Sequence, residues 1–84
     1  MQVVLKSVRH ANNEVEVEVM YIEANISFIE RKTFPGTATL ADLETAVKAT
    51  AGSIYQAMAT ANSFMIYINA AFYYDPVADT LTPI

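Results

Sequence analysis

The chain has 84 residues and a mass of 9.3 kDa. Domains are most often about 100–150 residues long, so we expect a single domain spanning residues 1–84. The chain contains no cysteine, so disulfide bonds cannot hold it together. Hydrophobic residues make up 54% and charged residues 17%, with only two glycines and three prolines. This composition is too apolar and too poor in breaking residues for a disordered tail.

The charge is acidic and scattered along the chain. Nine carboxylates against five lysines and arginines give a formal net charge of −4, and the basic residues never form a run. Nucleic-acid binding through phosphate neutralisation is therefore not expected. A targeting peptide needs a basic start and then an apolar stretch of about 7–15 residues. Here Lys6, Ser7 and Arg9 interrupt the first apolar residues. We expect an intracellular, cytoplasmic protein, with a virion as the alternative location.

The beginning of the chain predicts a β-hairpin. Residues 2–9 and 14–22 are rich in β-branched residues, which favour strands. The segment between them, residues 10–13, ends in two asparagines. Asparagine tolerates left-handed backbone, so this segment is expected to form the turn.

The charges suggest a register for this hairpin. A three-residue loop over residues 11–13 would place Lys6 opposite Glu18 and His10 opposite Glu14, whereas a two-residue loop would set Lys6 among valines. Opposite charges across a strand pair are favourable, so we expect the three-residue loop. The same register places an apolar set on one face of the hairpin: Val3, Leu5, Val15, Val17, Val19 and Tyr21.

A third strand is predicted over residues 26–34, after a turn at residues 24–25 and before a stop at residues 35–36, which are Pro and Gly. A short helix is the alternative for this region, because four residues would fall on one side of it: Tyr21, Ala24, Phe28 and Lys32.

A helix is predicted over residues 40–61. Thr39 followed by Asp42 is a capping-box pattern, and an acidic residue in the first turn suits the helix dipole. Residues 52–53, Gly and Ser, would allow a kink or a break, and we expect one helix with a possible kink there. Apolar residues at steps of three or four form one stripe along it: Leu40, Leu43, Val47, Ala51, Ile54 and Met58.

A strand is predicted over residues 64–74, where apolar residues occupy both alternating faces. A turn at residues 75–76 and a short edge strand at residues 80–82 would follow. We expect the more apolar face to pack beneath the helix stripe: Phe64, Ile66, Ile68, Phe72 and Tyr74.

These elements predict an α+β fold with the order β-β-β-α-β. The sheet would be mostly antiparallel, with four strands, or five if residues 80–82 pair as an edge, and with the helix on one face. One helix can cover only one face of such a sheet. A strand that is apolar on both faces therefore implies that something else covers the second face.

Residues suited to catalysis or metal binding are few. His10 is the only histidine and cysteine is absent, so one chain cannot build a three-ligand zinc site. Glu14, Glu16 and Glu18 would stand on one strand face about 6.6–6.8 Å apart, a spacing compatible with acid–base work or a hard cation. Cross-strand pairing with basic residues is the simpler interpretation of that row. We expect no enzymatic activity, no metal and no cofactor.

The long neutral segment gives the main functional expectation. Every residue from 49 to 74 is uncharged, but polar residues interrupt the segment too often for a membrane span. Neutral, aromatic-rich segments are typical of cores and of subunit interfaces. We expect a structural or interaction module that self-associates through its C-terminal half, of the kind frequent among particle and accessory proteins of phages and mobile elements. The expected interface residues are Met65, Tyr67, Asn69 and Tyr73.

A second hypothesis assigns the binding role to the acidic residues. In this alternative an acidic regulatory protein would present a carboxylate-rich strand face to a basic protein partner. The residues concerned are Glu14, Glu16, Glu18 and Glu23.

Overall fold

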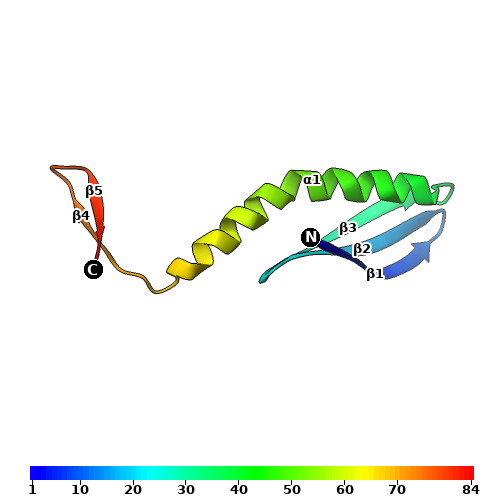
Figure 1. The fold of residues 1–84 in the computed structure, drawn as a ribbon. Helices are drawn as coiled ribbons and strands as arrows, with labels where there is room; N and C mark the ends of the chain where they lie inside the picture. The colour runs from blue at the N-terminus through cyan, green and yellow to red at the C-terminus, as the bar shows by residue number, and fades with distance from the viewer.

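The computed structural model describes all 84 residues and shows an elongated α+β chain with two separate sheets (Figure 1). A three-stranded antiparallel sheet lies at one end, one helix runs along it, and a two-stranded antiparallel sheet lies at the other end. The molecule measures 62 × 20 × 20 Å. In chain order the elements are β1 (Gln2–Ala11), β2 (Glu14–Glu23), β3 (Ile26–Pro35), α1 (Leu40–Phe64), the 3₁₀ turn η1 (Met65–Tyr67), β4 (Phe72–Asp75) and β5 (Thr80–Pro83).

The α+β class, the third strand and the single helix are confirmed. The predicted sheet of four or five strands is only partly matched, because three strands form the main sheet and two form a separate one. Strand β3 takes up the predicted residues 26–34, and a two-residue turn at Ala24 and Asn25 precedes it. The predicted edge strand at residues 80–82 exists as β5, but it pairs with β4 instead of joining the main sheet.

The predicted strand over residues 64–74 is wrong. Helix α1 continues to Phe64, η1 follows, and only Phe72–Asp75 of β4 is extended strand. Asn69 has a φ of 68°, a left-handed conformation that an unbroken strand does not allow. The face expected to pack beneath the helix is in solvent, with exposed fractions of 65% at Phe64 and 78% at Ile66.

The hairpin of β1 and β2 has a two-residue turn, Asn12 and Asn13, so the predicted three-residue loop is wrong near the turn. His10 lies opposite Val15 instead of Glu14. The register then shifts between Leu5 and Ser7, where a bulge absorbs one extra residue. The predicted pair of Lys6 with Glu18 is wrong, because Lys6 is the unpaired residue of the bulge and Glu18 lies opposite Ser7. Beyond the bulge the predicted register is present, with Val3 opposite Tyr21 and Leu5 opposite Val19.

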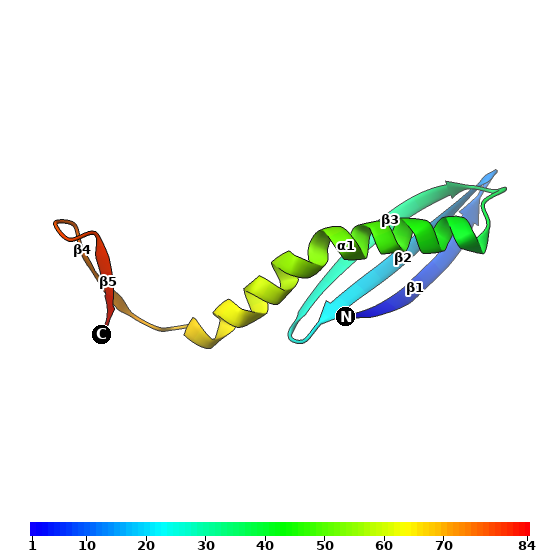
Figure 2. The same ribbon diagram turned by 45° about the horizontal axis from the view of Figure 1, so that its top comes forward.

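The core lies between the helix and the middle strand. Only four residues are buried, namely Val17, Val19 and Tyr21 of β2 and Met58 of α1. Part of the predicted helix stripe packs against this cluster: Leu43, Val47, Ala51 and Ile54. Helix α1 contacts β2 and β3 but not β1, and Figure 2 shows it crossing the sheet.

Side chains fix both ends of α1. The predicted capping box is present, with the Asp42 amide donating to Thr39 Oγ1 at 3.3 Å and the Thr39 amide donating to Asp42 Oδ2 at 2.9 Å. Near the other end, Asn62 Nδ2 donates to the Glu23 carbonyl at 2.7 Å, and Asn62 Oδ1 accepts from the Asn25 amide at 3.1 Å. These bonds tie the helix to the β2–β3 turn.

The helix is continuous through Gly52 and Ser53, as predicted, and it bends about its middle (Figure 1). Ser53 Oγ donates to the Thr50 carbonyl at 2.9 Å. Gly/Ser pairs and side-chain bonds to helix carbonyls are recognised causes of such bends.

Alanine substitution at the two glycines should change the free energy of unfolding in opposite directions. A Cβ at Gly36 would lie 2.7 Å from the Asn13 carbonyl oxygen, whereas a Cβ at Gly52 would meet nothing within 4 Å. Gly52→Ala should therefore raise the free energy of unfolding by about 0.5–1 kcal/mol, the helix-propensity difference. Gly36→Ala should lower the free energy of unfolding, because the backbone at Asn13 or at residue 36 would have to move to make room for the Cβ. Chemical denaturation of both variants checks this, and a stabilised Gly36→Ala would contradict the close approach.

Candidate functional site

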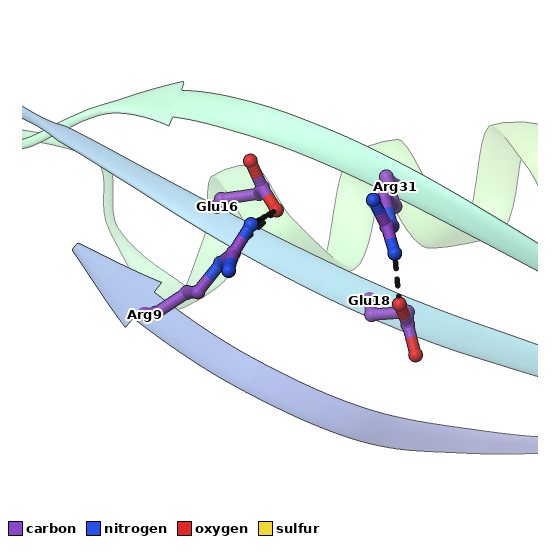
Figure 3. A network of polar contacts seen from close by, with 4 residues as sticks. All are labelled: Arg9, Glu16, Glu18 and Arg31. Carbon is purple, nitrogen blue, oxygen red and sulfur yellow. Dashed lines mark hydrogen bonds and ion pairs between the residues drawn. The ribbon is translucent and has the colours of Figure 1, made fainter. Parts of the chain in front are cut away.

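The predicted row of glutamates lies on the sheet face away from the helix, because the alternate residues of β2 are the buried ones. Two of its members are in ion pairs across the sheet (Figure 3). Arg9 donates to Glu16 Oε1 through Nη2 at 2.6 Å and through Nε at 3.2 Å. Arg31 Nε donates to Glu18 Oε2 at 3.2 Å. The row is thus held by cross-strand pairing, worth about 0.2–1 kcal/mol for each exposed pair.

Glu14 and Glu23, the other two residues of the predicted binding surface for a basic partner, lie apart from these ion pairs. Glu23 Oε2 is 3.1 Å from the N-terminal amine, and Glu14 has no ion pair. No group of three or more histidine, aspartate or glutamate residues is placed to hold a metal ion. His10 borders an open polar depression at the turn end of the sheet, together with Arg9 and Thr33.

A polar cluster in the helix–sheet interface was missed by the sequence reasoning. Glu30 of β3 lies opposite the buried Val19, so its side chain points toward the helix. Its carboxylate accepts from Tyr21 Oη at 3.2 Å and from Thr50 Oγ1 at 3.0 Å, and Lys32 Nζ lies 3.3 Å away. The sequence contained one signal for this cluster, because Glu30 is a charged residue at an inward-facing position of the predicted third strand. The carboxylate is fully partnered and half-buried, as a structural ion pair should be.

This cluster makes one tyrosine harder to ionise. Tyr21 has no exposed surface. Burial raises the pKa of its phenol above the usual 10.0, and the negative charge of Glu30 raises it further. A group whose folded pKa is raised stabilises the fold below its unfolded pKa, and the contribution is lost as the pH rises toward the folded pKa.

The free energy of unfolding should therefore fall above pH 10, by at most about 1.4 kcal/mol per pH unit for this one proton. Tyr21→Phe should remove this part of the decline. Tyr55→Phe is the matched control, because Tyr55 is 48% exposed on the same helix–sheet unit, and it should leave the decline in place. Urea denaturation at several alkaline pH values measures the effect, and an unchanged slope in Tyr21→Phe would contradict it.

The C-terminal arm, defined here as residues 65–84, is a separate unit. Strands β4 and β5 contact each other and no element of the main sheet or α1. The Tyr74 hydroxyl donates to Asp79 Oδ1 at 2.8 Å, which raises the pKa of Tyr74. Asp75 Oδ1 accepts from the amides of Val77 and Ala78 and so shapes the hairpin turn.

The four predicted interface residues all lie in the arm, but they do not share one strand face. Met65 is half-buried at the start of η1, and Asn69 is in the turn that follows. Tyr67 is 56% and Tyr73 is 64% exposed. The chain's own core buries part of the helical half of the neutral segment but not residues 64–74, where most large apolar side chains face solvent: Phe64, Ile66, Tyr67, Ile68, Phe72, Tyr73 and Tyr74.

No helix is long and apolar enough to span a membrane. Comparison of the chain with protein-family models, with curated proteins and with solved structures finds no match.

Proposed function

We propose that this protein is a non-enzymatic structural module that self-associates through its C-terminal arm. The observation that carries the proposal is the C-terminal arm, whose large apolar side chains lie in solvent and whose strands β4 and β5 do not contact the main sheet or α1. Exposed apolar patches of this extent are typical of protein–protein contact sites. The aromatic side chains of the arm are of the type enriched at interface centres.

The surface area supports the same proposal. The chain exposes 6364 Å², whereas a compact monomer of this mass exposes about 5,000 Å². The excess is about 1,400 Å², within the range of a stable protein–protein interface. The radius of gyration is 19.5 Å, against about 12 Å for a compact chain of this length.

The arm also needs a partner for its own stability. Strands β4 and β5 have four residues each, and an isolated two-stranded hairpin is marginal in water. Packing on another subunit would supply the apolar contacts that the arm does not find in its own chain.

The acidic-binding alternative has less support. Glu16, Glu18 and Glu23 already have cationic partners within the chain, so a basic partner would have to displace them. The setting that we propose, a particle or accessory protein of a phage or mobile element, is one in which small self-associating modules are needed.

At micromolar concentration, light scattering should report a multiple of 9.3 kDa for the intact chain. Tyr67→Glu should dissociate the assembly while the circular dichroism spectrum stays unchanged, because Tyr67 has no core contact. Ile29→Glu is the control outside the arm, 53% exposed on the sheet face away from the helix, and it should leave the mass unchanged. A monomer at all concentrations would refute the proposal.

A further inference from the structure

The apolar face of β1 is the second uncovered surface of the molecule. Val3, Leu5 and Val8 lie opposite the core-side residues of β2 and so face the helix side of the sheet. Since α1 does not contact β1, these three side chains remain 42%, 49% and 58% exposed. The outer edge of β1 is also unpaired, because β1 pairs only with β2.

The two edges of the main sheet differ in how well they are protected. The inward positions of β3 include Glu30 and Lys32, which form an ion pair at 3.3 Å. Inward-pointing charges at an edge strand disfavour the addition of another strand. Strand β1 has valines and leucine at the equivalent positions, so it is the edge more open to pairing.

The bulge in β1 sets the length of strand that this edge can accept. It separates a paired segment at Gln2–Leu5 from one at Ser7–Ala11. Either segment matches the four residues of β4 or β5. A long added strand would be interrupted by the bulge, whereas a short hairpin would not.

The arm matches β1 in backbone and in charge. Strand β5 contains Pro83, which has no N–H to donate, so β4 has the better free edge. The arm has two charged residues, Asp75 and Asp79, and β1 has one cationic side chain outside the intrachain ion pairs, Lys6. Unlike charges on two surfaces favour their encounter and their register.

We propose that β4 of one copy pairs with the free edge of β1 in a second copy and extends its sheet. This inference rests on the proposed self-association and names the surface that receives the arm. In that arrangement Phe72 and Tyr74, which alternate with Tyr73 on β4, lie beside the exposed apolar side chains of β1 on the same face of the extended sheet. Strand addition at an open edge obtains affinity from main-chain hydrogen bonds and selectivity from alternate side chains.

The contact is head-to-tail. The copy whose arm is bound still has a free β1 edge, and the copy whose β1 edge is occupied still has a free arm. Further copies can therefore add until the assembly closes into a ring, or without limit as a filament. An interface between two arms would instead be symmetric and would stop at a dimer. The two arrangements therefore predict different behaviour when variants are mixed.

The first test places a carboxylate on each edge of the main sheet in turn. Val8→Glu should weaken self-association of the intact chain more than tenfold in analytical ultracentrifugation. Ile29→Glu is the control on β3, similar in exposure at 53% against 58% for Val8 but on the sheet face away from the helix, and it should leave association unchanged. Circular dichroism and thermal unfolding verify that both variants remain folded. An assembly that resists Val8→Glu, or that Ile29→Glu dissociates, overturns the β1 assignment and leaves the proposed function standing.

The second test mixes two deficient variants. Val8→Glu keeps a normal arm, and Phe72→Glu keeps a normal β1, so each alone should be largely monomeric. Mixed, they should form a 1:1 complex, because one intact arm meets one intact β1 edge. Absence of that complex, with both variants folded, overturns the arm-to-β1 contact. A monomeric parent chain would refute self-association itself, so the two failures are distinguishable.

Discussion

The width of one helix limits how much of the sheet this chain can cover. An α-helix with its side chains is about 10–12 Å across, and strands in a sheet are about 4.8 Å apart, so one helix covers little more than two strands. Helix α1 lies on β2 and β3, and the apolar face of β1 stays in solvent. The core of four buried residues and the exposed edge both follow from this limit. Further cover for β1 has to come from outside the main sheet and its helix.

The local patterns that have a single physical interpretation were predictable. The Thr39–Asp42 capping box, the helix stripe and the turn at residues 24–25 are short-range features, and the structure has them. The hairpin register was predicted correctly only for residues 2–5 of β1. The charges of Lys6 and Glu18 suggested one uniform register for the whole strand pair. A bulge between Leu5 and Ser7 accommodates two registers in one strand pair, and it brings Val8 to the same face as Leu5 and Val3.

The second part of the neutral segment, residues 64–74, could not be assigned from its sequence. A run that is apolar at every position, as residues 64–68 are, fits the period of a strand and the period of a helix equally well. In the structure the first part of the run extends α1, because Asn62 binds the β2–β3 turn and Ser63 Oγ donates to the Thr60 carbonyl at 2.7 Å. The polar cluster at Glu30 was unpredictable for a related reason, since its partner Thr50 is set by how the helix lies on the sheet.

The same cluster gives the helix one position on an otherwise smooth surface. Small and medium apolar side chains at the helix–sheet contact would allow the helix to slide along the sheet. The hydrogen bonds from Tyr21 and Thr50 to Glu30 form in only one alignment of the helix on the sheet. With the helix fixed at Glu30 and at Asn62, the bend about the middle of α1 determines the direction in which the arm leaves the sheet (Figure 1). A head-to-tail contact closes or grows according to the rotation between successive copies. The curvature of this helix is therefore the feature that would decide between a ring and a filament.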